Sequence, residues 1–99
     1  MNQDDSLGQI LIVDDQIFNI DALEAIIRSK LKGKPIMIDT AQNGLEAVDK
    51  VKDNVIRNQN YCSYKIIFMD CNMPHMDGYT ASRKIRTYLK KKLNLDQDK

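Results

Sequence analysis

Three short apolar runs alternate with three longer segments of helical periodicity along this chain of 99 residues. The runs predict β-strands at 10–13, 35–39 and 64–69. The first of them, Ile10–Val13, is apolar at every position, which is typical of a parallel strand covered on both faces. The longer segments predict amphipathic helices at about 17–32, from just after Gly44 to about 58, and from about 78 onward.

Each predicted helix has one apolar face, and each is bounded by residues that favour turns. Gly33 and Pro35 follow the first helix in the order typical of helix ends. Asn43-Gly44, before the second helix, is predicted as a turn and nothing more. The apolar faces consist of Ile20, Leu23, Ile27 and Leu31, then Leu45, Val48, Val51 and Val55, then Ala81, Ile85 and Leu89.

The resulting order, βαβαβα, predicts an α/β fold with a parallel sheet and helices on both of its faces. With strand order 2-1-3, right-handed crossovers place the first helix on one face and the second on the other. The same order brings the carboxyl ends of the first and third strands side by side, at the edge where open α/β sheets bind ligands.

Carboxylates stand at both of those strand ends. Asp14 and Asp15 follow the first strand, and Asp70 ends the third, with Pro74 and Gly78 soon after it to turn the chain. Three carboxylates brought together repel one another and raise at least one pKa unless a cation is present. Mg²⁺ suits carboxylate oxygens and retained waters, so we expect a magnesium site here.

The overall composition limits the classes of partner that the chain is expected to bind. A hydrophobic share of 42% with 29% charged residues indicates a folded globular chain, and a net charge of +1 favours neither nucleic acid nor a membrane surface as partner. The sequence has no run long enough to cross a bilayer and no signal-peptide pattern. Cys62 and Cys71 flank the third strand, so we do not expect a disulfide between them. Free cysteines are typical of a reducing compartment, so we expect a cytoplasmic location.

Motifs in three regions of the chain, at 13–19, 41–47 and 70–78, resemble the receiver domain of two-component and phosphorelay signalling. Asp70-x-x-Met73-Pro74-x-Met76-Asp77-Gly78 resembles its phosphoacceptor block, and Asp14-Asp15 its acidic pair. The segments 13–19 and 41–47 are similar to the versions found in hybrid histidine kinases, and the resemblance covers roughly residues 9–89.

The resemblance implies a flavodoxin-like, three-layer fold and a set of roles. It makes Asp70 the acceptor of a phosphoryl group from a histidine kinase or a histidine phosphotransfer protein. It assigns Asp15 and the backbone carbonyl of Asn72 to Mg²⁺, with Asp14 contributing directly or through water. A receiver of this kind is a signalling domain rather than an enzyme.

The match departs from a complete receiver, which has five βα units. We expect a partial receiver domain over residues 9–92, truncated after the third unit, with a flexible entry at 1–8 and a polar tail at 93–99. The Thr or Ser and the Lys that the family carries on its fourth and fifth strands have no counterpart here. The third strand is then an open edge through which copies of the chain can associate.

Other interpretations remain open at this stage. The acidic pair could be a solvated loop or a helix cap, and Asp70 could cap a turn. The chain could be a degenerate receiver that binds proteins without phosphorylation, or a Mg²⁺-dependent phosphohydrolase with an Asp nucleophile. Asp77 is predicted to cap the third helix and Gly78 to permit a close approach, while His75 is predicted as an exposed loop residue and the basic residues of the last helix as a solvated face.

Overall fold

A computed structural model of the chain describes residues 9–59, 61–71, 73 and 76–93. The predicted βαβαβα order is confirmed. The elements are β1 (Ile10–Val13), α1 (Ile17–Lys30), β2 (Ile38–Ala41), α2 (Gly44–Arg57), β3 (Ile66–Met69) and α3 (Gly78–Leu93). The predicted flexible entry at 1–8, and all but the first residue of the predicted polar tail at 93–99, lie outside the described residues.

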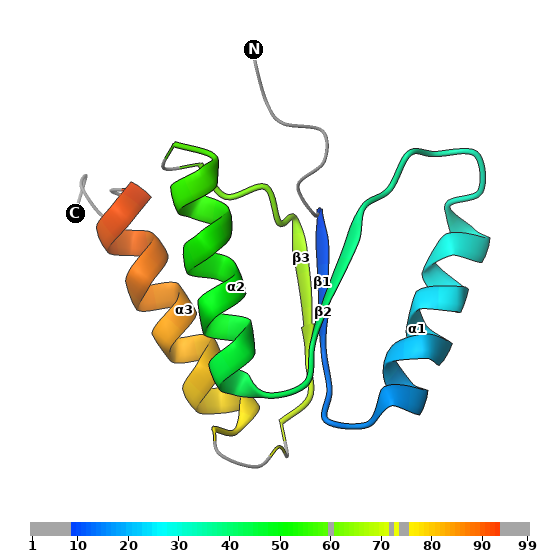
Figure 1. Cartoon of the computed structure of the whole chain (residues 1–99), viewed down its shortest axis with the longest axis horizontal. Helices are drawn as coiled ribbons and strands as arrows, with labels where there is room; N and C mark the ends of the chain where they lie inside the picture. The colour runs from blue at the N-terminus through cyan, green and yellow to red at the C-terminus, as the bar shows by residue number, and fades with distance from the viewer. Residues whose placement is uncertain (1–8, 60, 72, 74–75, 94–99) are drawn as a thin grey trace.

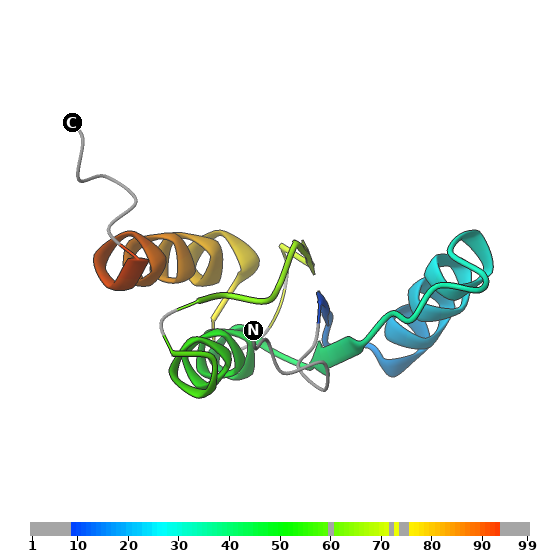
Figure 2. The same cartoon turned by 90° about the horizontal axis from the view of Figure 1, so that it is seen from above.

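The three strands form one parallel sheet in the order β2-β1-β3, as predicted. Helix α1 covers one face of the sheet, whereas α2 and α3 lie side by side on the other face (Figures 1 and 2). This three-layer arrangement is the flavodoxin-like architecture expected from the sequence, here with three βα units.

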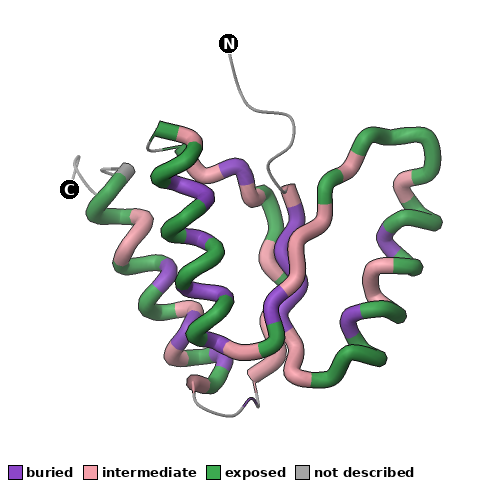
Figure 3. Tube along the Cα trace, in the orientation of Figure 1, coloured by how far each residue is buried: buried purple, intermediate pink, exposed green. Residues whose placement is uncertain are grey.

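Strand β1 is buried on both of its faces, as its apolar sequence predicts (Figure 3). Leu11 and Val13 pack into the core beneath α2 and α3, and Ile10 and Ile12 pack into a second core beneath α1. The alternation of side chains along a strand therefore divides the core into two, with β1 as the shared wall. The predicted apolar face of α1 is confirmed, with Ile20 and Ile27 buried.

Three boundary predictions are wrong. β2 begins at Ile38 rather than at 35, because Ile38 is the residue that pairs with Ile10 at the start of β1, and it continues to Ala41. β3 begins at Ile66 rather than at 64, because Ile66 is the residue that pairs with Ile10 on the other side of β1. α1 ends at Lys30 rather than at about 32, with Leu31 as its C-cap. α3 runs to Leu93, and its last turn carries Lys90, Lys91 and Lys92, whose positive charges are favourable at a helix C-terminus.

The predicted apolar face of α2 is wrong at its first residue. Leu45 is 51% exposed, whereas Gly44 and Ala47 are buried. The buried stripe runs through positions 44, 47, 48, 51, 54 and 55, so Leu45 lies to one side of it.

The same stripe contains a buried polar residue, Asn54. Its amide nitrogen donates to Ser63 Oγ at 2.6 Å, and the Ser63 backbone nitrogen donates to Asn54 Oδ1 at 2.9 Å. These bonds tie α2 to the segment that leads into β3. A second polar contact lies nearby, where the Tyr64 hydroxyl donates to Asp39 Oδ2 at 2.6 Å. The pKa of Tyr64 is raised, mainly because the hydroxyl is partly buried and secondly because of this bond.

The outer edge of β3 has no neighbouring strand in the described sheet. On the α1 side of this edge, Ile66 is 49% and Phe68 38% exposed. On the α3 side, the edge borders a groove of about 290 Å³. The groove is lined by Ile67, Met69, Ser82, Ile85, Arg86, Leu89 and Lys90.

Candidate functional site

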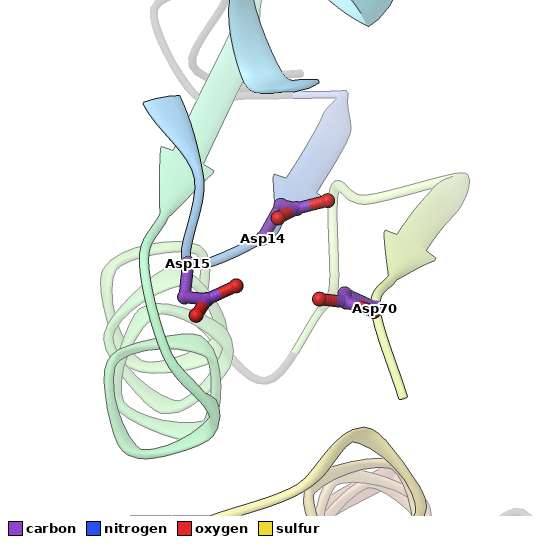
Figure 4. Close-up of side chains that lie close together, drawn as sticks. All are labelled: Asp14, Asp15 and Asp70. Carbon is purple, nitrogen blue, oxygen red and sulfur yellow. The ribbon is translucent and has the colours of Figure 1, made fainter. Parts of the chain in front are cut away.

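Three carboxylates meet at the carboxyl edge of the sheet. Asp14 and Asp15 directly follow β1, and Asp70 directly follows β3, so the pairing of these two strands brings them together. Each residue offers one carboxylate oxygen, and these oxygens all lie within 4.8 Å of one another. The side chains of Asp15 and Asp70 point toward each other, with Asp14 beside them (Figure 4). The predicted convergence of the three residues is therefore observed.

Backbone hydrogen bonds continue the sheet into the site. The Asp14 nitrogen donates to the Ala41 carbonyl at 3.1 Å, and the Asp70 nitrogen donates to the Val13 carbonyl at 2.9 Å. The two residues thus occupy fixed positions one step beyond the strands. All three aspartates are half-buried, which leaves the carboxylates open to solvent on one side.

The Asp14 carboxylate also contacts the start of α1. Its Oδ1 accepts a hydrogen bond from the Gln16 backbone nitrogen at 2.9 Å, and the Asn19 side-chain amide donates to Oδ1 at 3.3 Å and to Oδ2 at 3.2 Å. Gln16 is the N-cap residue of α1, and its own side chain makes no capping bond. Asp14 therefore takes over a capping contact, as one of the alternative interpretations proposed, while remaining part of the carboxylate cluster.

Gly78 brings the start of α3 against Asp70. A Cβ atom at position 78 would lie 2.1 Å from the Asp70 carbonyl oxygen and 2.8 Å from Cys71 Cα. Because both neighbours are backbone atoms, only glycine fits here, and the predicted close approach is confirmed. Asp77 caps α3 as predicted. Its Oδ1 accepts from the Thr80 backbone nitrogen at 2.7 Å, and this bond lowers the pKa of Asp77.

Asn43-Gly44 does more than make a turn, so that prediction is wrong. Asn43 is the N-cap of α2 and accepts from the Glu46 nitrogen at 2.8 Å, while Glu46 Oε1 accepts from the Gln42 nitrogen at 2.9 Å. A Cβ at Gly44 would lie 2.5 Å from the Met76 carbonyl oxygen. The helix start is therefore fitted against the loop that follows Asp70. The sequence signal was the Asn-x-x-Glu spacing, a variant of the capping box.

Some predicted residues lie outside the described part of the chain, among them Asn72, Pro74 and His75. The assignment of the Asn72 carbonyl to a metal therefore stays a prediction. Within the described residues, Asp14, Asp15 and Asp70 form the one group of three or more potential metal ligands. Carboxylate oxygens are the ligands that Mg²⁺ prefers, so the donor set fits this ion.

Comparison with known proteins places this chain in a family. The family model described as the response regulator receiver domain matches residues 10–94. The chain belongs to this receiver family. It is 36% identical over 89 residues to "Hybrid signal transduction histidine kinase B" of Dictyostelium discoideum, a match that covers 90% of this chain and 4% of that protein. It is 35% identical to "Two-component response regulator ORR41" of Oryza sativa subsp. japonica, a match that covers 79% of this chain and 55% of that protein.

A solved receiver domain agrees with the fold. The receiver domain of the histidine kinase CKI1 from Arabidopsis thaliana, solved in complex with Mg²⁺, has a TM-score of 0.66 and 30% sequence identity to the chain. The alignment covers 89% of this receiver chain and 63% of that chain. The predicted family and fold class are therefore confirmed, and the chain is a receiver domain of the two-component and phosphorelay type. Among the described residues, no helix is long and apolar enough to cross a membrane.

Proposed function

We propose that this receiver takes a phosphoryl group from a phosphohistidine donor onto Asp70. The observation that carries the proposal is the convergence of Asp14, Asp15 and Asp70 at the carboxyl edge of the sheet. Asp70 is the one of the three that stands at the end of β3, followed by the Met73–Gly78 block typical of the family. A histidine kinase or a histidine phosphotransfer protein is the proposed donor, as in the phosphorelays that hybrid histidine kinases serve.

In the proposed transfer, a carboxylate oxygen of Asp70 forms a bond to phosphorus while the bond between phosphorus and the donor imidazole nitrogen breaks. The electron pair of that broken bond stays on the imidazole. Phosphoryl transfer of this kind depends mainly on positioning and on offsetting charge. Positioning comes from the backbone bond between Asp70 and Val13 and from the contact of Gly78 with the Asp70 carbonyl.

Mg²⁺ is the proposed cofactor. Asp15 and Asp14 are proposed to hold it together with Asp70 and the Asn72 carbonyl. When bound, the ion neutralises charge on the phosphoryl oxygens. The Mg²⁺ complex of the CKI1 receiver supports this choice. A cytoplasmic location is part of the same proposal, supported by the two cysteines, Cys62 and Cys71, both free of disulfides.

Phosphoryl transfer tests the assignment of Asp70. The 99-residue chain is incubated with Mg²⁺ and a radiolabelled histidine phosphotransfer protein. We expect label on the wild type and on the control variant Asp77→Asn, and none on Asp70→Asn. Full label on Asp70→Asn contradicts the assignment. An unlabelled wild type favours a receiver that binds proteins without phosphorylation, and repeated turnover of a small phosphate ester favours a phosphohydrolase.

Titration with magnesium tests the metal site. Removing one of three clustered carboxylates in Asp15→Ala should weaken Mg²⁺ binding by at least about tenfold and leave the fold intact, because it also relieves repulsion. Asp49→Ala, which removes an exposed carboxylate from α2, is the matched control and should bind Mg²⁺ as the wild type does. Equal affinities for the wild type and Asp15→Ala would refute the site.

A further inference from the structure

Asn19 is the last residue of the segment 13–19 and has no role in the proposed transfer. It lies in the first turn of α1 and is itself exposed. Its side chain nevertheless turns back to the site, where one amide nitrogen donates to both Asp14 oxygens, at 3.3 Å to Oδ1 and 3.2 Å to Oδ2. An exposed amide that contacts both oxygens of a carboxylate restricts how that carboxylate can turn.

The remaining acceptor capacity of Asp14 follows from a count of these bonds. An ionised carboxylate has about four acceptor positions, two on each oxygen. Oδ1 accepts from the Gln16 nitrogen and from Asn19, so both of its positions are used. Oδ2 accepts from Asn19 alone among the bonds described above, which leaves one position for a metal ion or a metal-bound water.

The start of α1 explains why an asparagine can do this. The Asn19 nitrogen donates to the Gln16 carbonyl at 3.0 Å, so the backbone at position 19 is fixed by the first helical turn. From there a short side chain reaches back to the residue that precedes the helix. Asparagine combines this short reach with an N–H donor, which aspartate and leucine of similar size lack.

We propose that Asn19 is a positioning residue of the metal site. It holds Asp14 so that the carboxylate offers Oδ2, and only Oδ2, to the space shared with Asp15 and Asp70. This inference rests on the proposed function, because it concerns the Mg²⁺ that the three carboxylates would bind. Hydrogen-bond partners of a metal-ligating carboxylate typically change metal affinity by about 10- to 100-fold when they are removed.

The test measures the dissociation constant of Mg²⁺ alone, by calorimetric titration of the 99-residue chain. Asn19→Ala and Asn19→Leu both remove the donor without adding charge, and each should raise the dissociation constant by about tenfold. Asn19→Gln keeps an amide and should recover part of the loss. Gln16→Ala is the matched control, because it removes a neighbouring side-chain amide and keeps the backbone nitrogen that donates to Asp14.

Thermal unfolding without metal separates positioning from a structural role. Asn19→Ala should unfold close to the wild-type temperature, since alanine is a good helix former. If the wild type binds Mg²⁺ and the Asn19 variants bind it equally well, the inference about Asn19 is overturned and the metal site stands. If Gln16→Ala loses as much affinity as Asn19→Ala, the inference is also overturned. If the wild type binds no Mg²⁺, the proposed metal site fails, and the role of Asn19 fails with it.

Discussion

Alternate side chains of β1 point to the two faces of the sheet, yet the two faces are covered to very different extents. Beneath α2 and α3, the side chains of Leu11, Val51 and Val55 are fully buried, and the Asn54–Ser63 bonds lock the helix to the chain before β3. Beneath α1, the core is smaller, and Ile66 and Phe68 of β3 remain exposed beside it.

This difference matters because the site draws on both faces. Gly78 and Gly44 fit the loop around Asp70 against the well-packed side. The hydrogen bonds that orient Asp14 come from α1, on the thinly packed side. Elements with fewer buried contacts open locally at lower cost. The proposed phosphoacceptor, Asp70, therefore rests on the firmer half of the molecule, and one proposed metal ligand, Asp14, depends on the looser half.

The largest expected effect comes from truncating the two faces of β1 in turn. Leu11→Ala should lower the free energy of unfolding by about 4–5 kcal/mol, because Leu11 is fully buried in the larger of the two cores. Ile12→Ala should cost about 2–3 kcal/mol, because the smaller core under α1 can collapse around the cavity. Urea unfolding of both variants gives the comparison. Equal losses would mean that the two faces are packed equally well.

Two glycines sharpen the same comparison. Gly78→Ala should cost about 3 kcal/mol or more and slow phosphoryl transfer, since its Cβ would meet the backbone of Asp70. Gly33→Ala, next to α1, should cost only about 1–2 kcal/mol, because its φ of +83° is unfavourable for alanine but nothing lies within 4 Å of the added atom. Chemical denaturation measures both costs, and a Gly78→Ala chain as stable as the wild type would show that the loop can shift.

The exposed edge of β3 predicts self-association of the 99-residue chain, so that its sedimentation coefficient rises with concentration. Phe68→Lys places a charge on this edge and should weaken association by about tenfold. Phe18→Lys is the matched control, because Phe18 is 85% exposed and belongs to α1 rather than to β3. Sedimentation velocity over a concentration series tests this. A monomeric wild type, or an equal effect of both variants, would rule out the edge as the contact.

The smallest effect concerns the hydroxyl of Tyr64 on the α2 side. Because burial and the bond to Asp39 raise the pKa of Tyr64 in the folded state, its contribution to stability is present below about pH 10 and is lost as the pH rises further. Tyr64→Phe should cost about 1 kcal/mol at pH 8 and lose less stability than the wild type between pH 9 and 11. Tyr61→Phe, at an exposed position, is the control. Parallel pH profiles for the wild type and Tyr64→Phe would contradict this account.

The sequence was sufficient wherever one local pattern decided the outcome. The apolar run of β1 predicted a strand buried on both faces, and the carboxylates at the ends of two strands predicted the cluster, since adjacent parallel strands must bring their ends together. The cap of α3 by Asp77 followed from its position alone.

The sequence was insufficient where contacts distant along the chain decide. The start of β2 depends on its pairing with Ile10, and the exposure of Leu45 depends on where α2 sits over the sheet. The hydrogen bond from Tyr64 to Asp39 joins residues that are 25 positions apart, so no local sequence pattern predicts it. The contact of Asn19 with Asp14 spans only 5 positions, but it depends on the exact residue at which α1 begins, which the sequence pattern does not determine.

The bonds between Asn54 and Ser63 also bear on how the chain finds its fold. They close a loop across only 9 positions, and loops of this length close in roughly 10–100 ns. The contact can therefore form early and fix the point at which the chain enters β3. A strand of 4 residues makes only a short ladder with β1, and a slip of one residue would turn its side chains to the opposite faces. We therefore expect this polar pair, together with the pairing of β3 to β1, to set the strand register in which Asp70 reaches the site.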